Sequence, residues 1–304
     1  MTVDNTKRIR FEKPDLNELT KRYVVVDMHF HSRYSDGLNK VDAIAKRARK
    51  LGIGVAITDH NEIRKAIEID SYKDVLSIPG IEITSTEGAH ILVYFFEIES
   101  LEAFYHDYVK PHMGKEIMSS TDLEIEEIIK HARHFKTVIM FPHPYCGTYT
   151  GISNSYISEK RLKSIFSMID GLEVINAENL NIWNLRSALL GFNLDKGITG
   201  GSDGHRLSQM GKVVSYASCE PNREAFLNAI INKMNKVIGK ETDIIRKAAV
   251  GSVKLRRNIK NYPDLVEKNL KYSRTVINRK SKILKDNLKR SLNGKIKGKR
   301  KKLM

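Results

Sequence analysis

Short apolar runs of strand character alternate with stretches of helical periodicity along most of the chain. Residues 40–51, for example, carry apolar side chains at the spacing of one helix face, and Gly52 follows as a helix stop. The same analysis predicts strands at 23–27, 55–58, 75–83 (with a turn at 79–80), 91–96, 137–141, 172–175, 197–199 and 213–217. It predicts further helices at 101–109, 121–132, 159–168, 182–190 and 221–234.

The repeated alternation of strand and helix predicts an α/β protein with a mostly parallel sheet. Such a sheet is either an open, doubly wound one or a closed barrel. The alternating part spans roughly 210 residues, which suits a barrel slightly smaller than the eight-fold one of about 250. Residues 121–124, Thr-Asp-Leu-Glu, have capping-box spacing, so we expect the helix there to begin at Thr121.

Charge divides the chain into parts. The 304 residues include 52 Lys plus Arg and 36 Asp plus Glu, for a net charge of +16. Residues 1–240 contain 31 of each sign, whereas residues 241–304 contain 21 basic and 5 acidic residues. We therefore predict a polar leader over 1–21, a balanced barrel over 22–240 and a basic extension over 241–304. The extension is expected to be helical first and disordered at its end.

A basic extension favours binding to the phosphate backbone of a nucleic acid, which would bring that partner to the body. Two other interpretations stay open, a solubilising extension and helices packed on the barrel. A membrane surface is less favoured. Cys146 and Cys219 are the two cysteines, and the longest apolar run, 91–96, is far too short to cross a bilayer. With no visible secretory signal, these features predict a cytoplasmic protein.

Histidines and carboxylates gather at the ends of the expected strands. Side chains alternate in an extended segment, so Asp27, His29 and His31 project to one side where the first strand ends. Asp203 and His205 follow a later strand at the same spacing. The other members of this group are Asp36, His60, Glu82, His90 and His143. Barrels and open α/β sheets place their chemistry at this edge, so the pattern predicts a metal site.

These residues belong to a series of motifs: DMHFHSRYSDG, ITDHN, GIE followed by AHILVYF, FPHPY, GLEVINAEN and GSDGH. In content and order the series resembles the polymerase and histidinol phosphatase (PHP) superfamily of metal-dependent phosphoesterases. The resemblance covers about residues 23–217 and leaves the basic extension outside. It implies a distorted (β/α)7, TIM-like barrel, the PHP fold, with two or three divalent metal ions.

Carried over residue by residue, the resemblance also implies how the ligands are shared. One metal would be held by His29, His31, Glu82 and Asp203, a second by Glu82, His90 and His143, and a third by Asp36, His60 and His205. Every expected ligand type is present. Mixed nitrogen and oxygen ligands favour Zn, Mn or Fe over Mg.

The charge of this site indicates its substrate. Three carboxylates with six neutral imidazoles carry −3, and three divalent cations turn that to +3, which an anion balances. We therefore expect hydrolysis of phosphate esters by a metal-activated hydroxide, without a covalent enzyme intermediate. The substrate would be a nucleotide or oligonucleotide phosphate or a small phosphomonoester. The segment between the GIE and FPHPY motifs is short, which favours an open site.

Asp59 and Arg206 are further candidate catalytic residues. Asp59 is expected to orient His60 or a neighbouring imidazole, and Asp27 to do the same for His29 or His31. Arg206 directly follows a ligand and is the preferred contact for substrate phosphate. Other candidates for that contact are Arg33, Tyr145, Asn176 and Lys212.

Two alternatives differ in class from a phosphoesterase. Amidohydrolase barrels also begin with His-x-His and end with an Asp, but they lack this combination of SDG, TDH and GIE, and we find no candidate bridging lysine. The other alternative is a nucleic-acid-binding protein in which the metal-bound barrel is only structural.

Overall fold

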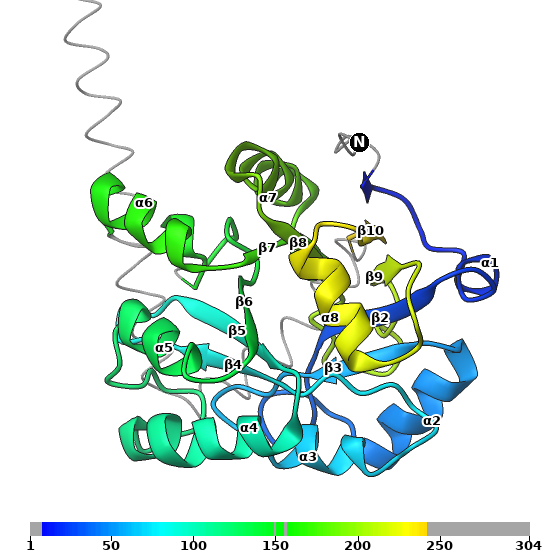
Figure 1. Cartoon of the computed structure of the whole chain (residues 1–304), viewed down its shortest axis with the longest axis horizontal. Helices are drawn as coiled ribbons and strands as arrows, with labels where there is room; N and C mark the ends of the chain where they lie inside the picture. The colour runs from blue at the N-terminus through cyan, green and yellow to red at the C-terminus, as the bar shows by residue number, and fades with distance from the viewer. Residues whose placement is uncertain (1–7, 149, 155–156, 242–304) are drawn as a thin grey trace, which may run out of the picture.

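The computed structural model of the chain describes residues 8–148, 150–154 and 157–241. Apart from Glu241, the basic extension predicted over 241–304 lies outside the described residues. Within them, two five-stranded sheets are flanked by helices on their outer sides (Figure 1). No helix in the described ranges combines the length and apolar character needed to cross a membrane.

The first sheet has the strand order β1-β10-β9-β2-β3, and the second has the order β4-β5-β6-β7-β8. The strands of the first sheet are β1 (Ile9–Arg10), β2 (Val24–Phe30), β3 (Gly54–Ile57), β9 (Val213–Ala217) and β10 (Lys236–Gly239). Those of the second are β4 (Gly80–Thr84), β5 (His90–Phe95), β6 (Thr137–Phe141), β7 (Gly171–Asn176) and β8 (Gly197–Gly201).

The prediction of a mostly parallel sheet is wrong. The pairs β1–β10, β2–β3, β6–β7 and β7–β8 are parallel, and the other four pairings are antiparallel. Strands β4 and β5 show the cause, because a short turn joins them, closed by the bond from Ser85 N–H to the Ala89 carbonyl at 2.9 Å. A connection this short cannot return the chain to its starting edge, so the second strand reverses direction.

A closed TIM-like barrel is not confirmed either. Among the described residues, backbone pairing between the two sheets is limited to isolated bridges. In one of them His60, after β3, pairs with Glu82 within β4, and in another Phe30 of β2 pairs with Gly204, after β8. The backbone leaves the extended region close to both bridges, since φ is 47° at Asn61 and 47° at Asp203. Left-handed residues end a regular ladder, so pairing is interrupted where the candidate ligands lie.

The helices surround these sheets. They are α1 (Leu16–Leu19), α2 (Val41–Leu51), α3 (Arg64–Asp70), α4 (Ile98–Phe104), α5 (Ile125–Ala132), α6 (Glu159–Met168), α7 (Asn181–Leu194) and α8 (Arg223–Ile231). A π-helical turn, Tyr105–Val109, continues α4. Helix α2 ends as its sequence predicts, with Gly52 at a φ of 67° in the left-handed region.

Buried apolar side chains attach the helices to the strands. The largest cluster packs Phe104 of α4 and Ile128 of α5 against Phe95 of β5 and Phe141 of β6. Burial of side chains of this size contributes about 1.5–3 kcal/mol each relative to exposure. This packing holds the strands, and therefore the segments that follow them, in fixed positions.

Helix α5 begins at Ile125, four residues later than predicted. Thr121 does not cap it, because its Oγ1 donates to the Thr84 carbonyl at 2.9 Å and its N–H donates to the same oxygen at 2.8 Å. The capping box is formed instead by Glu124 and Glu127. Thr121 thus joins the segment before α5 to the end of β4.

Residues 8–21, expected to lie in a leader outside the barrel, belong to the fold. Strand β1 pairs with β10, and Leu19 is buried. Arg8 is also buried, and its guanidinium donates to the carbonyl and the side-chain oxygen of Asn235. Although the composition of this segment is polar, its Arg8 and Leu19 side chains are buried in the fold.

Asp27 joins β2 to the segments that follow β8. Its carboxylate accepts from Ser202 N–H at 2.9 Å, from Ser202 Oγ at 2.6 Å and from Gly211 N–H at 2.9 Å. It also accepts the backbone N–H of His29 at 3.5 Å. Asp27 thus bonds to the backbone of His29, whereas we expected it to orient an imidazole. Burial raises the pKa of Asp27 to about 6, against the opposing effect of these donors.

We predict that Asp27→Asn lowers the free energy of unfolding by about 2 kcal/mol at pH 8, where the carboxylate is ionised. The amide nitrogen of Asn would face backbone N–H groups, and at least one buried donor would lose its acceptor. Urea unfolding measures the change. The exposed Asp107→Asn should stay within about 0.5 kcal/mol of the wild type. Equal stability of both variants would contradict this role of Asp27.

Candidate metal centre

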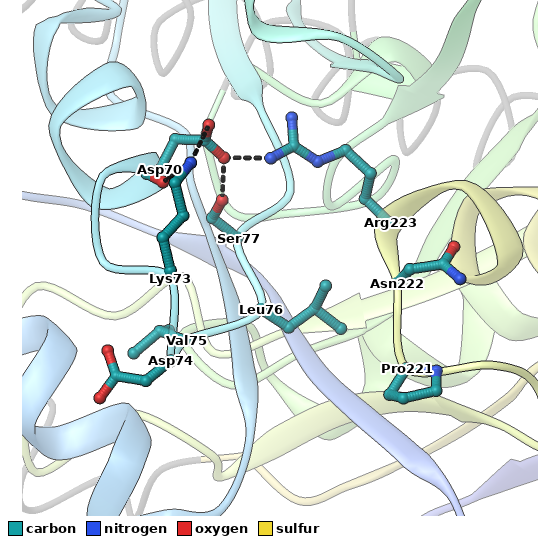
Figure 2. Close-up of a pocket in the computed structure, with 9 residues that line it drawn as sticks. All are labelled: Asp70, Lys73, Asp74, Val75, Leu76, Ser77, Pro221, Asn222 and Arg223. Carbon is teal, nitrogen blue, oxygen red and sulfur yellow. Dashed lines mark hydrogen bonds and ion pairs between the residues drawn. The ribbon is translucent and has the colours of Figure 1, made fainter.

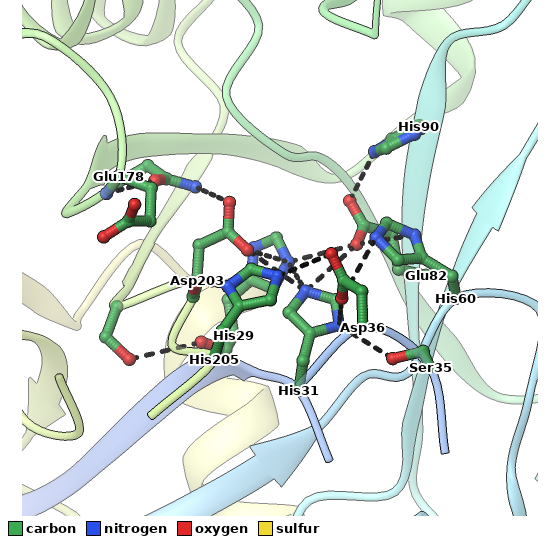
Figure 3. A network of polar contacts seen from close by, with 12 residues as sticks. His29, His31, Ser35, Asp36, His60, Glu82, His90, Glu178, Asp203 and His205 are labelled. Atoms are coloured by element: carbon green, nitrogen blue, oxygen red, sulfur yellow. Dashed lines mark hydrogen bonds and ion pairs between the residues drawn. The ribbon is translucent and has the colours of Figure 1, made fainter. Parts of the chain in front are cut away.

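All nine side chains predicted as ligands converge on one site, formed where the two sheets meet. Figure 3 labels all of them except His143. His29 lies on β2, Glu82 on β4 and His90 at the start of β5. The others occupy segments that follow strands: His31 and Asp36 after β2, His60 after β3, His143 after β6, and Asp203 and His205 after β8. Every one is buried except Asp203, whose side chain is 17% exposed.

The first predicted group is present in part, because His29, His31 and Asp203 form one compact group, whereas Glu82 groups with His31 and His60 and with His90 and His143. His29 Nε2 lies 3.1 Å from His31 Nε2 and 3.3 Å from Glu82 Oε2. Asp203 Oδ1 lies 3.1 Å from His31 Nε2 and 3.6 Å from His29 Nε2. Asp203 and Glu82 therefore both contact the two imidazoles, and only Asp203 forms a compact three-residue group with them.

The second predicted group is present as well. Glu82 Oε1 lies 2.8 Å from His90 Nδ1 and 3.4 Å from His143 Nε2. The other oxygen of Glu82 faces the first group, so the carboxylate lies between the two groups. This is the arrangement that one carboxylate shared by two cations requires.

The third predicted group is arranged differently. Asp36 Oδ2 lies 2.8 Å from His205 Nε2, but His60 Nε2 is 3.9 Å from Asp36 Oδ1. His60 turns its Nδ1 toward Glu82 Oε2 at 3.2 Å, and His31 groups both with Asp36 and His205 and with His60 and Glu82. His31 thus connects the third group to the first.

The donor set fits divalent metal ions. A neutral imidazole has one N–H and one lone pair. His29 Nδ1 lies 3.1 Å from Glu173 Oε1, which places the N–H there and turns the lone pair of Nε2 toward the oxygens of Glu82 and Asp203. Lone pairs that face each other at this distance repel unless a proton or a metal ion lies between them, and a divalent ion can satisfy several such pairs at once.

The ionisation of the centre follows from burial and from charge. Burial lowers the pKa of His60 to about 3, so this ring is a neutral ligand at any physiological pH. Burial alone would raise the pKa of Glu82, but the imidazoles around it hold that pKa well below its usual range. The carboxylate therefore stays ionised, as a metal ligand must be.

Glycines allow the close approach of the strands at this site. A Cβ on Gly201 would lie 2.3 Å from the Cβ of His29, and one on Gly204 would lie 2.4 Å from the Phe30 ring. Asp203, between them, has a φ of 47°, and His143 has a φ of 30°. Such backbone costs about 1–3 kcal/mol per residue and persists where the surroundings enforce it.

Glu173 was not predicted and lies directly behind the ligands. Its Oε1 faces His29 Nδ1 at 3.1 Å, and its Oε2 accepts from the His143 backbone N–H at 3.0 Å and from Asn176 Nδ2 at 2.9 Å. Asn176, a predicted phosphate contact, also donates to Asp203 Oδ2 at 3.2 Å. Glu173 thus orients a ligand ring and the strand end that carries another. An acidic residue inside the apolar run of β7 was the signal available in the sequence.

Asp59 reaches an imidazole through an intervening serine. It accepts from Ser32 N–H at 2.7 Å and from the Ser35 hydroxyl at 2.6 Å, and Ser35 Oγ lies 3.4 Å from His31 Nδ1. It therefore holds the segment after β2 that carries two ligands, and its contact with an imidazole runs through Ser35 to His31. Arg206 is half-buried, and its backbone N–H donates to Gln209 Oε1 at 2.8 Å. The role of its guanidinium stays a prediction.

A cavity of about 470 Å³ lies away from the metal centre, near the amino ends of β3 and β4 (Figure 2). Asp70 at its wall is paired with Arg223 and accepts from the hydroxyl of Ser77. Opposite charges are thus already matched inside it. A cluster of Glu87, Glu124 and Glu126 is likewise neutralised in part by Arg161.

Comparison with known proteins gives one family and several similar structures. The model of the PHP domain family matches residues 27–272. This match confirms the resemblance that the motifs predict, and it continues well past residue 217, where we expected the resemblance to end. A search of curated proteins found no match.

Among solved structures, the chain is similar to a two-domain protein from Bacteroides vulgatus containing a predicted PHP-like metal-dependent phosphoesterase. The identity is 18%, over 77% of this chain and 69% of that one, with a TM-score of 0.54. It is also similar to endonuclease Q bound to a 27-mer duplex with an abasic lesion, at 19% identity over 72% of this chain, with a TM-score of 0.57.

The enzyme from Pyrococcus furiosus gives the same TM-score of 0.57 at 19% identity, over 71% of this chain. The chain spans 60% and 57% of the two endonuclease chains. At these identities the likeness concerns the fold.

We predict that Glu173→Gln weakens binding of Zn²⁺ or Mn²⁺ by about 10–100-fold, because outer-shell partners orient the ligand rings. The amide would present an N–H to the His143 N–H or to the ring of His29. Isothermal titration calorimetry at pH 7.5 measures the dissociation constants. Exposed Glu159→Gln, the matched control, should bind as the wild type does. A Glu173→Gln constant within twofold of the wild type would remove Glu173 from the site.

Proposed function

Since the chain belongs to the PHP domain family, we propose that it is a metal-dependent hydrolase of phosphate esters with a centre of two or three divalent ions. The observation that carries the proposal is the convergence of six imidazoles and three carboxylates, with ligand atoms 2.8–3.9 Å apart. Bound divalent ions would supply Lewis-acid activation of water and neutralise charge on the phosphate.

In this proposal, some residues of the chain would bind the metal ions, and others would orient those ligands. Asp203 carries the most exposed edge of the centre, whereas His29 and His31 beside it are fully buried. Glu82 contributes one oxygen to each of the first two groups and holds them next to each other. Asp59 and Glu173 restrain the segments that carry the ligands. A phosphate group would therefore enter beside Asp203, with Arg206 in the same segment as its proposed partner.

Charge supports an anionic substrate. The three carboxylates of the centre carry −3 with neutral imidazoles, and two or three divalent cations make the total positive. A phosphate ester supplies the balancing charge. Zn, Mn and Fe suit this donor set, and the ligand types do not choose among them.

The substrate class that we propose is the phosphate of a nucleotide or oligonucleotide, with a small phosphomonoester as the simpler case. The fold likeness to endonuclease Q, solved with a DNA duplex, supports the first. The excess of basic residues in 241–304 supports it independently, since 21 Lys and Arg stand against 5 acidic residues there. The cytoplasmic location stays a prediction.

We predict that His29→Ala and Asp203→Ala each lower kcat/KM at least about 100-fold, more than the loss of an outer-shell partner costs. The substrates are p-nitrophenyl phosphate, short oligonucleotides and a duplex with an abasic site, each with Mn²⁺ or Zn²⁺ added. His106→Ala and Asp107→Ala, exposed residues of the same types, are the controls. Turnover unaffected by the two site changes would overturn the assignment. Salt-sensitive DNA binding without turnover of any substrate would favour the structural-barrel alternative.

The extension is tested by salt dependence. Replacing four basic residues by Gln should lower the slope of log Kd against log salt for a DNA duplex by about 3–4. Hydrolysis of p-nitrophenyl phosphate should not change. The four residues are Lys299, Arg300, Lys301 and Lys302, and the control replaces exposed Lys46, Lys50, Lys130 and Lys160. Equal slopes for the two variants would remove the end of the extension from nucleic-acid binding.

A further inference from the structure

Helix α7 packs Ala188, Leu190 and Leu194 against buried clusters, but its larger apolar residues also form a second, exposed face. Ile182, Leu185, Leu189 and Phe192 are 54%, 42%, 63% and 54% exposed. Their spacing of three, four and three residues places them on one face, which we call the α7 stripe. The helix lies at the edge of the molecule (Figure 1). A contiguous exposed apolar face of this kind marks a surface that something covers.

Hydrogen bonds and close packing fix the opposite face of α7 on the sheet. Asn184 is buried and exchanges two hydrogen bonds with the backbone of Asn176, at 2.9 and 3.1 Å. A Cβ on Gly191 would lie 3.0 Å from Val174 Cγ1, so the helix sits close to β7. Rotation of α7 to bury the stripe would break these bonds. The stripe therefore needs a partner that comes to it.

The last described residue of the chain lies next to the start of α7. Glu241, the last described residue, accepts a hydrogen bond from Asn181 Nδ2 at 3.5 Å, and Asn181 is the first residue of α7. A further 63 residues follow, numbered 242–304. They begin beside the first turn of the helix that carries the stripe.

The sequence that follows suits the stripe. Apolar residues at 244, 245, 248 and 249 alternate with charged ones at a spacing that gives one apolar face. The family match also continues to residue 272, so these residues belong to the part of the chain that matches the PHP domain. From Ile182 to Phe192 the stripe is about 15 Å long, which ten residues cover even at helical rise.

We propose that the segment directly after Glu241, within residues 242–272, packs its apolar face on the α7 stripe. The segment thereby anchors the basic residues that follow it to the edge of the body. A second copy of the chain is the weaker occupant. The stripe offers four large side chains, whereas stable interfaces use about 20–30 residues a side.

The first test is photo-cross-linking in the full chain. A benzophenone amino acid replaces Leu189, and irradiation is followed by mass spectrometry. The expected product is an intramolecular link to residues 242–272 at the mass of one chain. A product at twice that mass, which would mean a second copy, or links to other segments only, would overturn the proposal.

The second test compares hydrogen exchange in full-length variants. Leu189→Glu and Asn193→Glu add the same charge at exposed positions of α7, but only the first interrupts the stripe. In the wild type, amides within 244–253 should exchange at least about tenfold more slowly than an unstructured chain. Leu189→Glu should remove this protection and Asn193→Glu should keep it. Fast exchange in the wild type, equal responses of the variants, or protection that grows with protein concentration would contradict the proposal.

Discussion

The structure depends on one electrostatic constraint, the confinement of several buried carboxylates and imidazoles in one small space. Glu82 is at its middle, within 2.8–3.4 Å of five imidazoles: His29, His31, His60, His90 and His143. Buried charges of this kind are costly unless paired or bound to metal. Protons can relieve part of the repulsion. Burial opposes a charge on His29, but Asp203, Glu173 and Glu82 raise its pKa well above the ordinary value. Divalent cations satisfy all these groups at once.

The arrangement of the two sheets brings these buried groups together. The two sheets meet at the centre, and regular pairing between them is reduced to single bridges where ligands lie, such as His60 with Glu82. Left-handed backbone at His143 and Asp203 turns these ligands out of their strands, and Gly201 lets β8 approach His29. The apolar clusters under the helices provide the stability that offsets this local strain. Asp27 and Asp59 then connect the ligand-bearing segments to the strands.

The sequence predicted which polar side chains converge better than it predicted the pairing of the sheets. Period-two spacing at strand ends locates polar side chains at one edge whatever the pairing, so His29, His31, Asp203 and His205 could be found without the topology. The direction of β5 depends on a short turn, and the closure of the sheets depends on backbone angles at Asn61 and Asp203, which strand patterns do not encode. Glu173 was missed because it lies inside an apolar strand. Thr121 was misassigned because its hydroxyl pairs with Thr84 rather than with its own helix.

The central claim is that Glu82 is shared by two cations in a centre of two or three divalent ions. Native mass spectrometry of the chain reconstituted with Zn²⁺ or Mn²⁺ tests it most directly, with Glu82→Gln measured beside the wild type. We expect two or three ions per wild-type chain and the loss of more than one ion's occupancy in the variant. A wild-type chain that binds fewer than two ions, or a variant that keeps the full number, would contradict it.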